Sequence, residues 1–288
     1  MKTRNYFLTF ALVAASVVST YFVTASTAQQ NAQATRPTAD NEYQVAAVLY
    51  MQKAGEYRAL AYQAFNLAHL RLDTDFDKKN VKKLPKAERK MPRAVVVDID
   101  ETVLDNSPQQ AYSIKSRLPF NLQTWYAWGE KREAKAIPGA VDFLKYAAQK
   151  GVKVFYVSNR DDVQAQATID NLKAVGFPDA TAETVRLRVN NQSTKEPRRL
   201  AISQKYRIVM LVGDNLDDLS NVFERKSVAD RFNEVDKARA EFGDKFIVLP
   251  NAMYGTWENA IYEYGRLNEA QKAEKRNSSL EAFQPTAP

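Results

Sequence analysis

Two aspartates stand two positions apart directly after a short apolar run, and residues of this type and spacing can do chemistry. Residues 94–97 are apolar, Asp98 follows them, and Asp100 comes after Ile99. Along an extended chain, a spacing of two directs both side chains to the same side. Two carboxylates on one side repel each other unless a cation or a shared proton relieves them. Because Mg²⁺ prefers oxygen ligands of this kind, the pair indicates a magnesium site.

Two other interpretations of the same segment compete with a magnesium site. An isolated Asp-x-Asp most often marks a strand that runs into an acidic turn, and for these two residues alone that alternative stays open. An EF-hand calcium loop also begins with Asp-x-Asp, but it requires glycine at its sixth position and glutamate at its twelfth. Those positions hold Val103 and Gln109, so an EF-hand is excluded.

The elements that must position these acids alternate between strand and helix patterns. Residues 94–97 are small or β-branched, which is typical of a strand buried on both faces of a parallel sheet. Further strands are expected at 152–157, 185–189, 208–212 and 246–249, and helices at 138–150, 161–175, 197–206, 215–223, 228–242 and 255–267. This alternation predicts an α/β fold with a doubly wound parallel sheet. In such sheets ligands bind at the carboxyl ends of the strands, where Asp98 and Asp100 lie.

Two further groups of polar residues are expected at that edge of the sheet. Ser158 and Asn159 end the second strand just before a predicted helix, whose free N–H groups and dipole favour a phosphate. By itself, Ser158 is more often a simple N-cap. Lys195 precedes the helix at 197–206, where a cation gains nothing from the helix dipole. Aimed at a transferring phosphoryl group it is useful, and a solvated surface lysine is the alternative.

A third acidic group follows the fourth strand. Gly213 permits a tight turn from strand to helix, and Asp214 and Asp218 are one helical turn apart. Taken alone, acids at a helix N-terminus are ordinary capping residues. Next to a strand that ends in Asp98 and Asp100, Asp214 becomes a third carboxylate for one Mg²⁺.

These four groups, in this order, resemble the four motifs of the haloacid dehalogenase (HAD) superfamily. Residues 98–102 match the pattern D-x-D-x-T, and residues 214–218 match the acidic motif GDxxxD with Gly213. Residues 98–107, 212–218 and 249–255 resemble the DxDET-x-LDNS, GDNLDD and LPNxxYG segments of class C acid phosphatases, and residues 55–64 are similar to a helical segment ahead of their core. The likeness spans residues 45–267 and is strongest to the lipoprotein e branch. That branch is tethered through a lipidated cysteine, which this chain lacks.

The resemblance implies a role for each matching residue and an HAD-like Rossmannoid core with a small, mostly helical accessory region. It implies that Asp98 is the nucleophile toward phosphorus and that Asp100 is the acid and base, with Mg²⁺ as cofactor. The implied metal ligands are Asp98, Asp214 and Asp100, the last through its backbone carbonyl. Ser158, Asn159 and Lys195 are implied to bind phosphate, with Thr102 and Asp218 in support. The implied substrates are small phosphate monoesters, including nucleoside 5′-monophosphates, rather than a nucleic-acid polymer.

Aromatic residues add a possible specificity element. Trp125, Trp128 and Tyr254 are candidates to stack on a nucleobase, and core packing is an equal alternative for each. A non-catalytic binding or storage protein on the same scaffold is a second hypothesis for the whole chain. The presence of Asp98 argues against that hypothesis. A homodimer is also possible.

Composition limits the chemistry further. The chain has 288 residues, 45% hydrophobic and 26% charged, which suits one α/β domain with an accessory element. It contains no cysteine, which excludes disulfides and thiol-based phosphatase or protease chemistry. His69 is the single histidine and lies in a helical pattern, so a mechanism with two histidines is excluded. Removal of residues 1–28, with Lys2 and Arg4, lowers the net charge from +7 to +5. This mild excess suits anionic substrates without requiring nucleic acid.

The first residues have the layout of a targeting segment. Lys2 and Arg4 precede an apolar stretch at 6–23, and small residues follow it. This layout predicts a signal peptide at 1–28, with cleavage and export to the periplasm or the medium. The alternative is an uncleaved membrane anchor, because the stretch is only just long enough to span a bilayer. The mature chain is expected to have no membrane span.

The rest of the chain is expected to divide into three parts. Residues 29–93 comprise a flexible leader, a helical segment broken near Gly55 and a basic linker at 77–93. The phosphatase core is expected at 94–267, with an aromatic-rich insert at 105–137. Residues 268–288 are expected to be a frayed helix and a loose polar tail.

Overall fold

The structure is a computed structural model that describes residues 41–284. The signal peptide expected at 1–28 and nearly all of the expected leader lie outside the described residues. None of the helices within 41–284 is long and apolar enough to cross a membrane.

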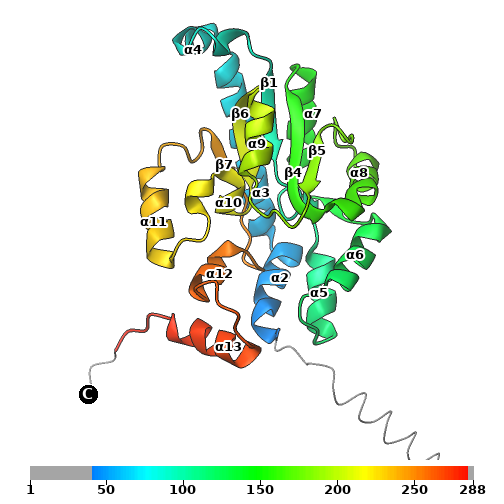
Figure 1. Ribbon diagram of the computed structural model, residues 1–288, viewed down its shortest axis with the longest axis vertical. Coiled ribbons are helices and arrows are strands. Elements are labelled where there is room, and N and C mark those ends of the chain that lie inside the picture. Colours follow the sequence, from blue (N-terminus) through cyan, green and yellow to red (C-terminus); the bar gives the residue numbers. More distant parts are fainter. Residues whose placement is uncertain (1–40, 285–288) are drawn as a thin grey trace, which may run out of the picture. The chain divides into compact units, whose positions relative to one another are not determined.

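Five parallel strands form the central sheet, as the sequence predicts (Figure 1). They are β1 (Arg93–Val97), β4 (Lys153–Asp161), β5 (Val185–Arg188), β6 (Arg207–Gly213) and β7 (Phe246–Val248), in the order β5-β4-β1-β6-β7. From β1 the chain builds outward to β5, then returns to the other side of β1 for β6 and β7. The order therefore reverses between β1 and β6, and crevices for ligands form at such a point.

The alternating residues of β1 show that both faces of the sheet are buried. Val95 and Val97 belong to one hydrophobic cluster, and Ala94 and Val96 to another. Successive side chains of a strand point to opposite faces, so the two clusters lie on opposite sides of the sheet. The prediction of a strand buried on both faces is confirmed.

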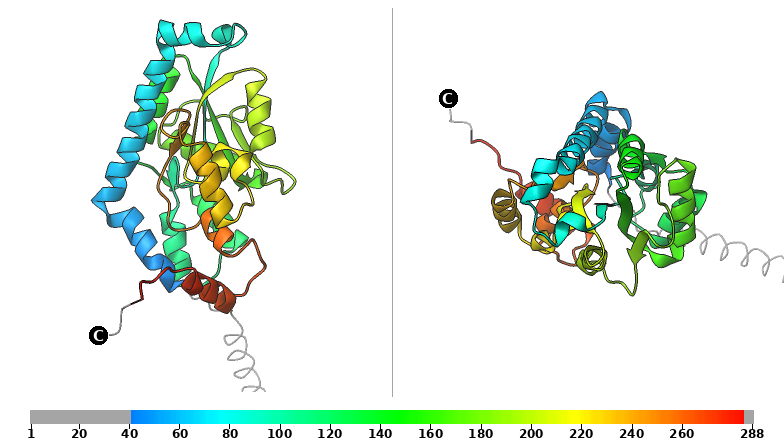
Figure 2. Two further views of the ribbon diagram at one scale, coloured as in Figure 1. Left: turned by 90° about the vertical axis from the view of Figure 1, so that its left-hand side faces the viewer. Right: turned by 90° about the horizontal axis from the view of Figure 1, so that it is seen from above.

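Helices cover each face of this sheet. The first cluster is covered by α3 (Gly55–Phe76), α7 (Ala140–Gln149) and α8 (Ala165–Ala174), and α3 runs lengthwise along the sheet (Figure 2). The second cluster is covered by α9 (Glu196–Ser203), α10 (Leu216–Leu219), η4 (Asn221–Phe223) and α11 (Val228–Lys237). Burial of both apolar faces stabilises the layered arrangement.

A group of further helices lies beyond one end of the sheet (Figure 1). It comprises η1 (Glu42–Gln44), α2 (Val45–Lys53), α5 (Ser107–Lys115), α6 (Leu122–Lys131), η3 (Asp162–Gln164), α12 (Thr256–Ile261) and α13 (Glu269–Ser278). The helices α5 and α6 lie in the chain between β2 (Leu104–Asp105) and β3 (Lys135–Ala136), which pair antiparallel. This pairing joins the two ends of the segment that the sequence marks as aromatic-rich.

Several helix boundaries differ from the expected ones. The helix expected at 255–267 ends at Ile261, because Glu263 and Tyr264 adopt left-handed backbone conformations with φ of 52° and 57°. The helix expected at 228–242 ends at Lys237. The basic stretch at 77–93 contains α4 (Lys78–Lys83) and η2 (Glu88–Lys90). In the polar tail, α13 starts at a capping box between Asn268 and Gln271.

One partly buried carboxylate, that of Asp75, ties α3 to the starts of two strands. Asp75 accepts hydrogen bonds from Arg93 Nε and from both terminal nitrogens of Arg207, each at 2.6 Å. Burial raises the pKa of Asp75, but the hydrogen bonds from Arg207 and Arg93 lower it by more. Its folded pKa therefore lies below its ordinary value, and the ionised carboxylate stabilises the fold.

We expect Asp75→Asn to reduce the free energy of unfolding by about 2 kcal/mol near neutral pH, because hydrogen bonds to a charged group are lost. A lowered folded pKa gives stability that is present above the ordinary carboxyl pKa of about 4 and is lost as the pH falls through the folded value. Urea denaturation at neutral pH and at about pH 3 measures both effects. The difference in unfolding free energy between the wild type and Asp75→Asn should become smaller in acid. Asp236→Asn, at an exposed position of α11, is the control. A difference in unfolding free energy that grows in acid would contradict stabilisation by the ionised carboxylate of Asp75.

Candidate active site

A cavity of about 1010 Å³ opens at the carboxyl ends of β1 and β6 and beside the last turn of β4. Asp98, Ser158, Lys195 and Asp214 all line it. These residues are far apart in the sequence. The sheet order β4-β1-β6 brings Ser158, Asp98 and Asp214 side by side, and α9 brings Lys195. The convergence expected from the sequence is therefore present in the fold.

Three carboxylates meet at one side of this cavity. One oxygen each of Asp98, Asp214 and Asp218 lies within 4.8 Å of the other two. Oxygens around an octahedral Mg²⁺ are about 2.1 Å from the ion and thus up to about 4.2 Å apart. The donor set, all oxygen and all anionic, therefore fits a hard divalent cation.

The turn after β6 explains how Asp218 reaches this cluster. The backbone N–H of Asn215 donates to Asp218 Oδ2 at 3.0 Å, in a capping box that starts α10. A Cβ at Gly213 would lie 2.5 Å from the Cβ of Asp218, which no side chain tolerates. Glycine was expected here for a tight turn, and the structure shows that its reason is the close approach of Asp218.

The electrostatics of the cluster favour a bound cation. Burial raises the pKa of Asp98 well above its ordinary value; Lys195 opposes this rise, and the neighbouring carboxylates add to it. Burial and the charge of Asp218 raise the pKa of Asp214 to about 7, against hydrogen bonds from Asn251 and Thr102. Buried like charges of this kind are relieved by a metal ion.

Lys195 is the one cation in direct contact with these carboxylates among the described residues. It occupies the N-cap position of α9, as expected, and its side chain is only 6% exposed. Its ammonium group contacts the carboxylate of Asp98 and lies 2.6 Å from Asp218 Oδ1. Burial lowers the pKa of Lys195, but Asp218 and Asp98 raise it by more, so the group stays charged. A solvated surface lysine is therefore excluded.

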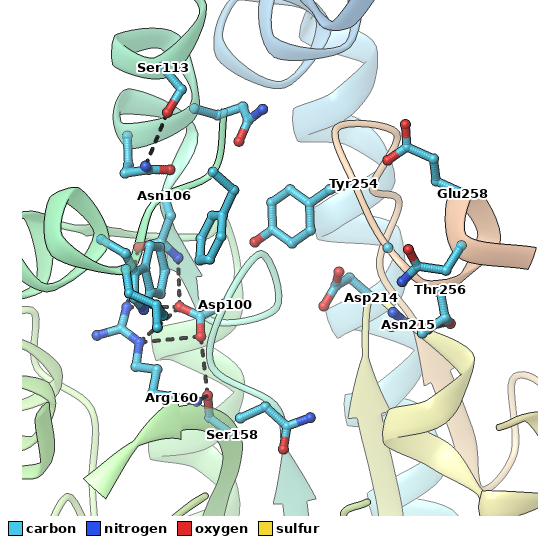
Figure 3. Close-up of a pocket in the computed structure, with 18 of the residues that line it drawn as sticks. Asp100, Asn106, Ser113, Ser158, Arg160, Asp214, Asn215, Tyr254, Thr256 and Glu258 are labelled. Carbon is cyan, nitrogen blue, oxygen red and sulfur yellow. Dashed lines mark hydrogen bonds and ion pairs between the residues drawn. The ribbon is translucent and has the colours of Figure 1, made fainter. Parts of the chain in front are cut away.

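Asp100 lies on the other side of the cavity (Figure 3). Its carboxylate accepts hydrogen bonds from Asn106 Nδ2 at 2.8 Å, Arg160 Nε at 2.9 Å and Ser158 Oγ at 3.1 Å. Arg160 is 3% exposed and forms an ion pair with Asp100. Asp98 and Asp100 thus line one cavity, but the side chain of Asp100 is held by Asn106 and by Ser158 and Arg160 of β4 rather than by the acidic cluster.

Arg160 is a site residue that was not expected from the sequence. The signal was present, because Arg160 is two positions after Ser158 in the strand pattern and so points to the same side.

Helical structure begins after Ser158 and Asn159 nearly where it was expected, one residue later than the predicted start at 161. β4 continues to Asp161, which pairs with Arg188 of β5, and helical structure starts only at Asp162. This pairing keeps the chain extended past Ser158. Ser158 is fully buried and also accepts a hydrogen bond from the backbone N–H of Arg160 at 3.1 Å. Asn159 is exposed at the cavity, and its side-chain oxygen accepts from Arg198 at 2.6 Å.

Two neutral side chains orient Asp214. Thr102 Oγ1 donates to Asp214 Oδ1 at 2.9 Å, and Asn251 Nδ2 donates to Asp214 Oδ2 at 2.9 Å. Thr102 was expected only in a supporting role, and its hydroxyl reaches the acid that follows the neighbouring strand. Asn251 was quoted only as part of a family segment, without a role.

The three candidate aromatic residues lie in two different environments. Trp125 and Tyr254 line the cavity, and Tyr254 faces its interior (Figure 3). The guanidinium of Arg160 lies 5.3 Å from the ring centroid of Trp125, a cation–π contact. Trp128 instead packs against the main hydrophobic cluster, and its indole N–H donates to Asn106 Oδ1 at 2.8 Å. Core packing is therefore the better account of Trp128.

Comparison with known proteins agrees with this geometry. The model of the HAD superfamily, subfamily IIIB (acid phosphatase), matches residues 8–257. The class C acid phosphatase from Bacillus anthracis is 43% identical, with a TM-score of 0.78 over 85% of this chain and 99% of that chain. A second structure of that enzyme, with tungstate bound, is 42% identical, with the same coverage and a TM-score of 0.78.

Plant proteins are more distant relatives. Acid phosphatase 1 of Solanum lycopersicum is 26% identical over 129 residues, and the stem 31 kDa glycoprotein of Glycine max is 31% identical over 134 residues. Each match covers 43% of this chain, and the chain spans about half (51%) of the length of these curated relatives. Because the family model matches residues 8–257 and the bacterial enzyme is 43% identical and matched over 99% of its own length, this chain belongs to the class C acid phosphatases of HAD subfamily IIIB.

Proposed function

We propose that the protein is a Mg²⁺-dependent phosphatase that hydrolyses phosphate monoesters through an aspartyl-phosphate intermediate. The observation that carries the proposal is the convergence of Asp98, Asp214, Lys195 and Ser158 on one cavity. Carboxylates for a metal, a nucleophile and groups that bind phosphate oxygens are together what phosphoryl transfer requires.

Mg²⁺ would be held by the carboxylates of Asp98 and Asp214, with the backbone carbonyl of Asp100 by resemblance to the family. Asp218 is close enough to ligate directly or to orient the others. When bound, the ion supplies positive charge that neutralises the carboxylates and the phosphoryl oxygens.

In the first step, an oxygen of Asp98 attacks phosphorus, and the bond from phosphorus to the ester oxygen breaks. Asp100 donates a proton to the leaving alkoxide. In the second step, Asp100 takes a proton from a water molecule, which attacks phosphorus and releases Asp98 and inorganic phosphate. Hydrogen bonds from Asn106, Arg160 and Ser158 hold Asp100 in place for both transfers.

Lys195 and Ser158 would bind the equatorial phosphoryl oxygens, and the exposed amide of Asn159 would add a hydrogen bond. Charge spreads onto those oxygens in the transition state, so fixed donors there lower the barrier. Tungstate is a tetrahedral oxyanion like phosphate, and its presence in the related Bacillus anthracis structure supports an oxyanion site in this one.

The direct test is phosphate release from p-nitrophenyl phosphate with and without metal. We expect turnover in Mg²⁺, loss to background after EDTA treatment, and full recovery when Mg²⁺ is restored, because the clustered carboxylates need a cation to accept an anionic substrate. Ca²⁺ at equal concentration serves as a control for ionic effects, since it favours longer bonds and more ligands. Full activity in EDTA contradicts the metal requirement, and no release under any metal contradicts the enzyme assignment.

Nucleoside 5′-monophosphates are proposed as substrates on the basis of the aromatic residues at the cavity. Tyr254 and Trp125 could stack on a base while the phosphate reaches Asp98. A base stacked on an aromatic ring contributes about 1–3 kcal/mol.

We expect Tyr254→Ala to raise the KM for AMP about tenfold and to leave the kcat and KM for p-nitrophenyl phosphate nearly unchanged, because the small aryl ester does not need the stacking contact. Steady-state kinetics on both substrates measure this, and Tyr112→Ala, at an exposed tyrosine of α5, is the matched control. Equal losses of kcat/KM on both substrates would contradict stacking and would indicate that Tyr254 supports the structure of the site.

A non-catalytic binding protein remains the second candidate, because the same cavity could hold a phosphate without turnover. It would bind tungstate and release no phosphate from any ester.

We further propose export to the periplasm or the medium, on the layout of residues 1–28, which lie outside the described residues.

A further inference from the structure

We propose that Arg198 and Arg199, neighbours in the first turn of α9, are positioning residues that hold the catalytic loops at their working distance. The inference rests on the proposed function, because it concerns the placement of Ser158, Lys195 and Asp218. Together with Lys195, the two arginines are called the α9 clamp below.

Arg198 joins the end of β4 to the segment that carries Lys195. Its Nη1 donates to the backbone carbonyl of Ser158 at 2.7 Å. Its Nη2 donates to Asn159 Oδ1 at 2.6 Å and to the backbone carbonyl of Thr194 at 3.1 Å. One guanidinium group therefore sets the spacing between the two segments assigned to phosphate binding.

Arg199 joins α9 to the acidic turn after β6. Its Nη1 donates to the backbone carbonyls of Asp218 at 2.7 Å and Asp217 at 3.0 Å. Its Nη2 forms an ion pair with Glu196 Oε2 at 2.6 Å, which fixes the guanidinium against its own helix. Arg199 is 4% exposed, so these carbonyls have no ready substitute donor from solvent.

Helical spacing explains why one short segment reaches three strands. Positions 195, 198 and 199 are related as i, i+3 and i+4, and such residues share one helix face. Lys195 contacts Asp98 after β1, Arg198 contacts β4, and Arg199 contacts the turn after β6. Because β4, β1 and β6 are adjacent in the sheet, the α9 clamp spans the carboxyl ends of all three.

Arginine is needed at both positions because its planar guanidinium group donates hydrogen bonds in two directions at once. The ammonium group of lysine, on a flexible aliphatic chain, does not reproduce this geometry. Neither guanidinium contacts a carboxylate group of the acidic cluster, so the two arginines act through the placement of Ser158, Lys195 and Asp218. A displacement of about 1 Å at such residues costs about a hundredfold in rate.

The first test uses Arg198→Ala, with Arg89→Ala as the matched control. The guanidinium of Arg89 also donates to two backbone carbonyls, those of Leu84 and Lys82, in the segment before β1. We expect Arg198→Ala to lower kcat for p-nitrophenyl phosphate at least tenfold and to weaken tungstate binding by a similar factor, measured by calorimetry. Arg89→Ala should change neither. Wild-type values for Arg198→Ala in both measurements would overturn the inference.

A double-mutant cycle separates positioning from a general loss of structure. If Arg198 acts through Ser158, its removal in a Ser158→Ala background should cost at least threefold less than in the wild type. Equal costs in both backgrounds would overturn the proposed route. Thermal unfolding of each variant shows whether the loss of rate follows stability instead, which would also contradict positioning.

The second test uses Arg199→Lys, because this conservative change keeps a charge at a buried position. Arg199 holds the turn that carries Asp218, so we expect the Mg²⁺ concentration for half-maximal activity to rise about tenfold, as for other residues that orient metal ligands. Arg198→Lys should leave that concentration unchanged and weaken tungstate binding. The same Mg²⁺ dependence in both variants would contradict the separate roles.

Separate results would contradict the proposed function and the α9 clamp. If the wild type hydrolyses phosphate esters and both arginine variants match it, the α9 clamp is wrong and the proposed function stands. If the wild type releases no phosphate, the proposed function is wrong, and tungstate affinity in Arg198→Ala still tests the α9 clamp. A wild type that binds no tungstate contradicts both.

Discussion

Replacing Asp98 with asparagine should reduce phosphate release from AMP and p-nitrophenyl phosphate about a thousandfold or more, as loss of an enzyme nucleophile does. The side chain of Asp98 is 8% exposed at the end of β1 and faces Lys195 and the other acids. An amide is isosteric with the carboxylate but cannot attack phosphorus to form the aspartyl-phosphate. The loss should therefore fall on kcat for both substrates, whatever their leaving group.

Mg²⁺-dependent phosphate release measures this loss, and two controls make it specific. Asp170→Asn removes a carboxylate on α8 that pairs with Arg132 at the surface, and it should keep wild-type rates. Asp98→Asn should still bind tungstate, which shows that the cavity is intact. Turnover by Asp98→Asn equal to that of the wild type would rule out nucleophilic catalysis by this residue.

Replacing Lys195 with methionine should have a double effect. Loss of a preorganised donor to the phosphoryl oxygens lowers kcat by about a hundredfold or more. In the metal-free protein, removing one partner of a buried ion pair should also cost about 3 kcal/mol of unfolding free energy, because Asp98 and Asp218 then face each other without a buried cation. Methionine fills a similar volume, so the second effect is electrostatic.

Urea denaturation in EDTA and in saturating Mg²⁺ separates the two parts. Because a bound cation stabilises the folded state by mass action and supplies the missing charge, Mg²⁺ should recover much of the lost stability while kcat stays low. Lys153→Met is the control, since Lys153 pairs with Asp179 at 2.8 Å with a third of its side chain exposed, and such pairs contribute little. An equal loss of stability with and without Mg²⁺ would contradict the shared role of Lys195 and the metal.

The order of elements and the place of the chemistry could be read from the sequence, because both depend on local patterns. A run of small and β-branched residues that ends in Asp98 is buried on both faces wherever it packs. Strand and helix alternation defines the fold class, and the carboxyl ends of parallel strands meet at one edge. That is why Ser158, Lys195 and Asp214 could be assigned to the same edge as Asp98.

Boundaries of elements depended on tertiary contacts. β4 extends to Asp161 because Arg188 pairs with it across the sheet, and no local pattern around Ser158 contains that information. The early end of α12 follows from two left-handed residues that a periodic apolar pattern does not reveal. Trp125 and Trp128 are three positions apart in α6, and only packing decides which of them lines the cavity.

The sequence by itself determined which chemical groups this protein has and at which strand ends they stand, because apolar periodicity and polar spacing act over a few residues. Only the tertiary structure decided which groups touch. The contacts of Arg160 with Asp100, of Asn251 with Asp214 and of Arg198 with Ser158 join residues separated by 60, 37 and 40 positions. Such pairs form when the sheet sets its strands in the order β5-β4-β1-β6-β7, and the lengths and directions of the side chains then select the partners.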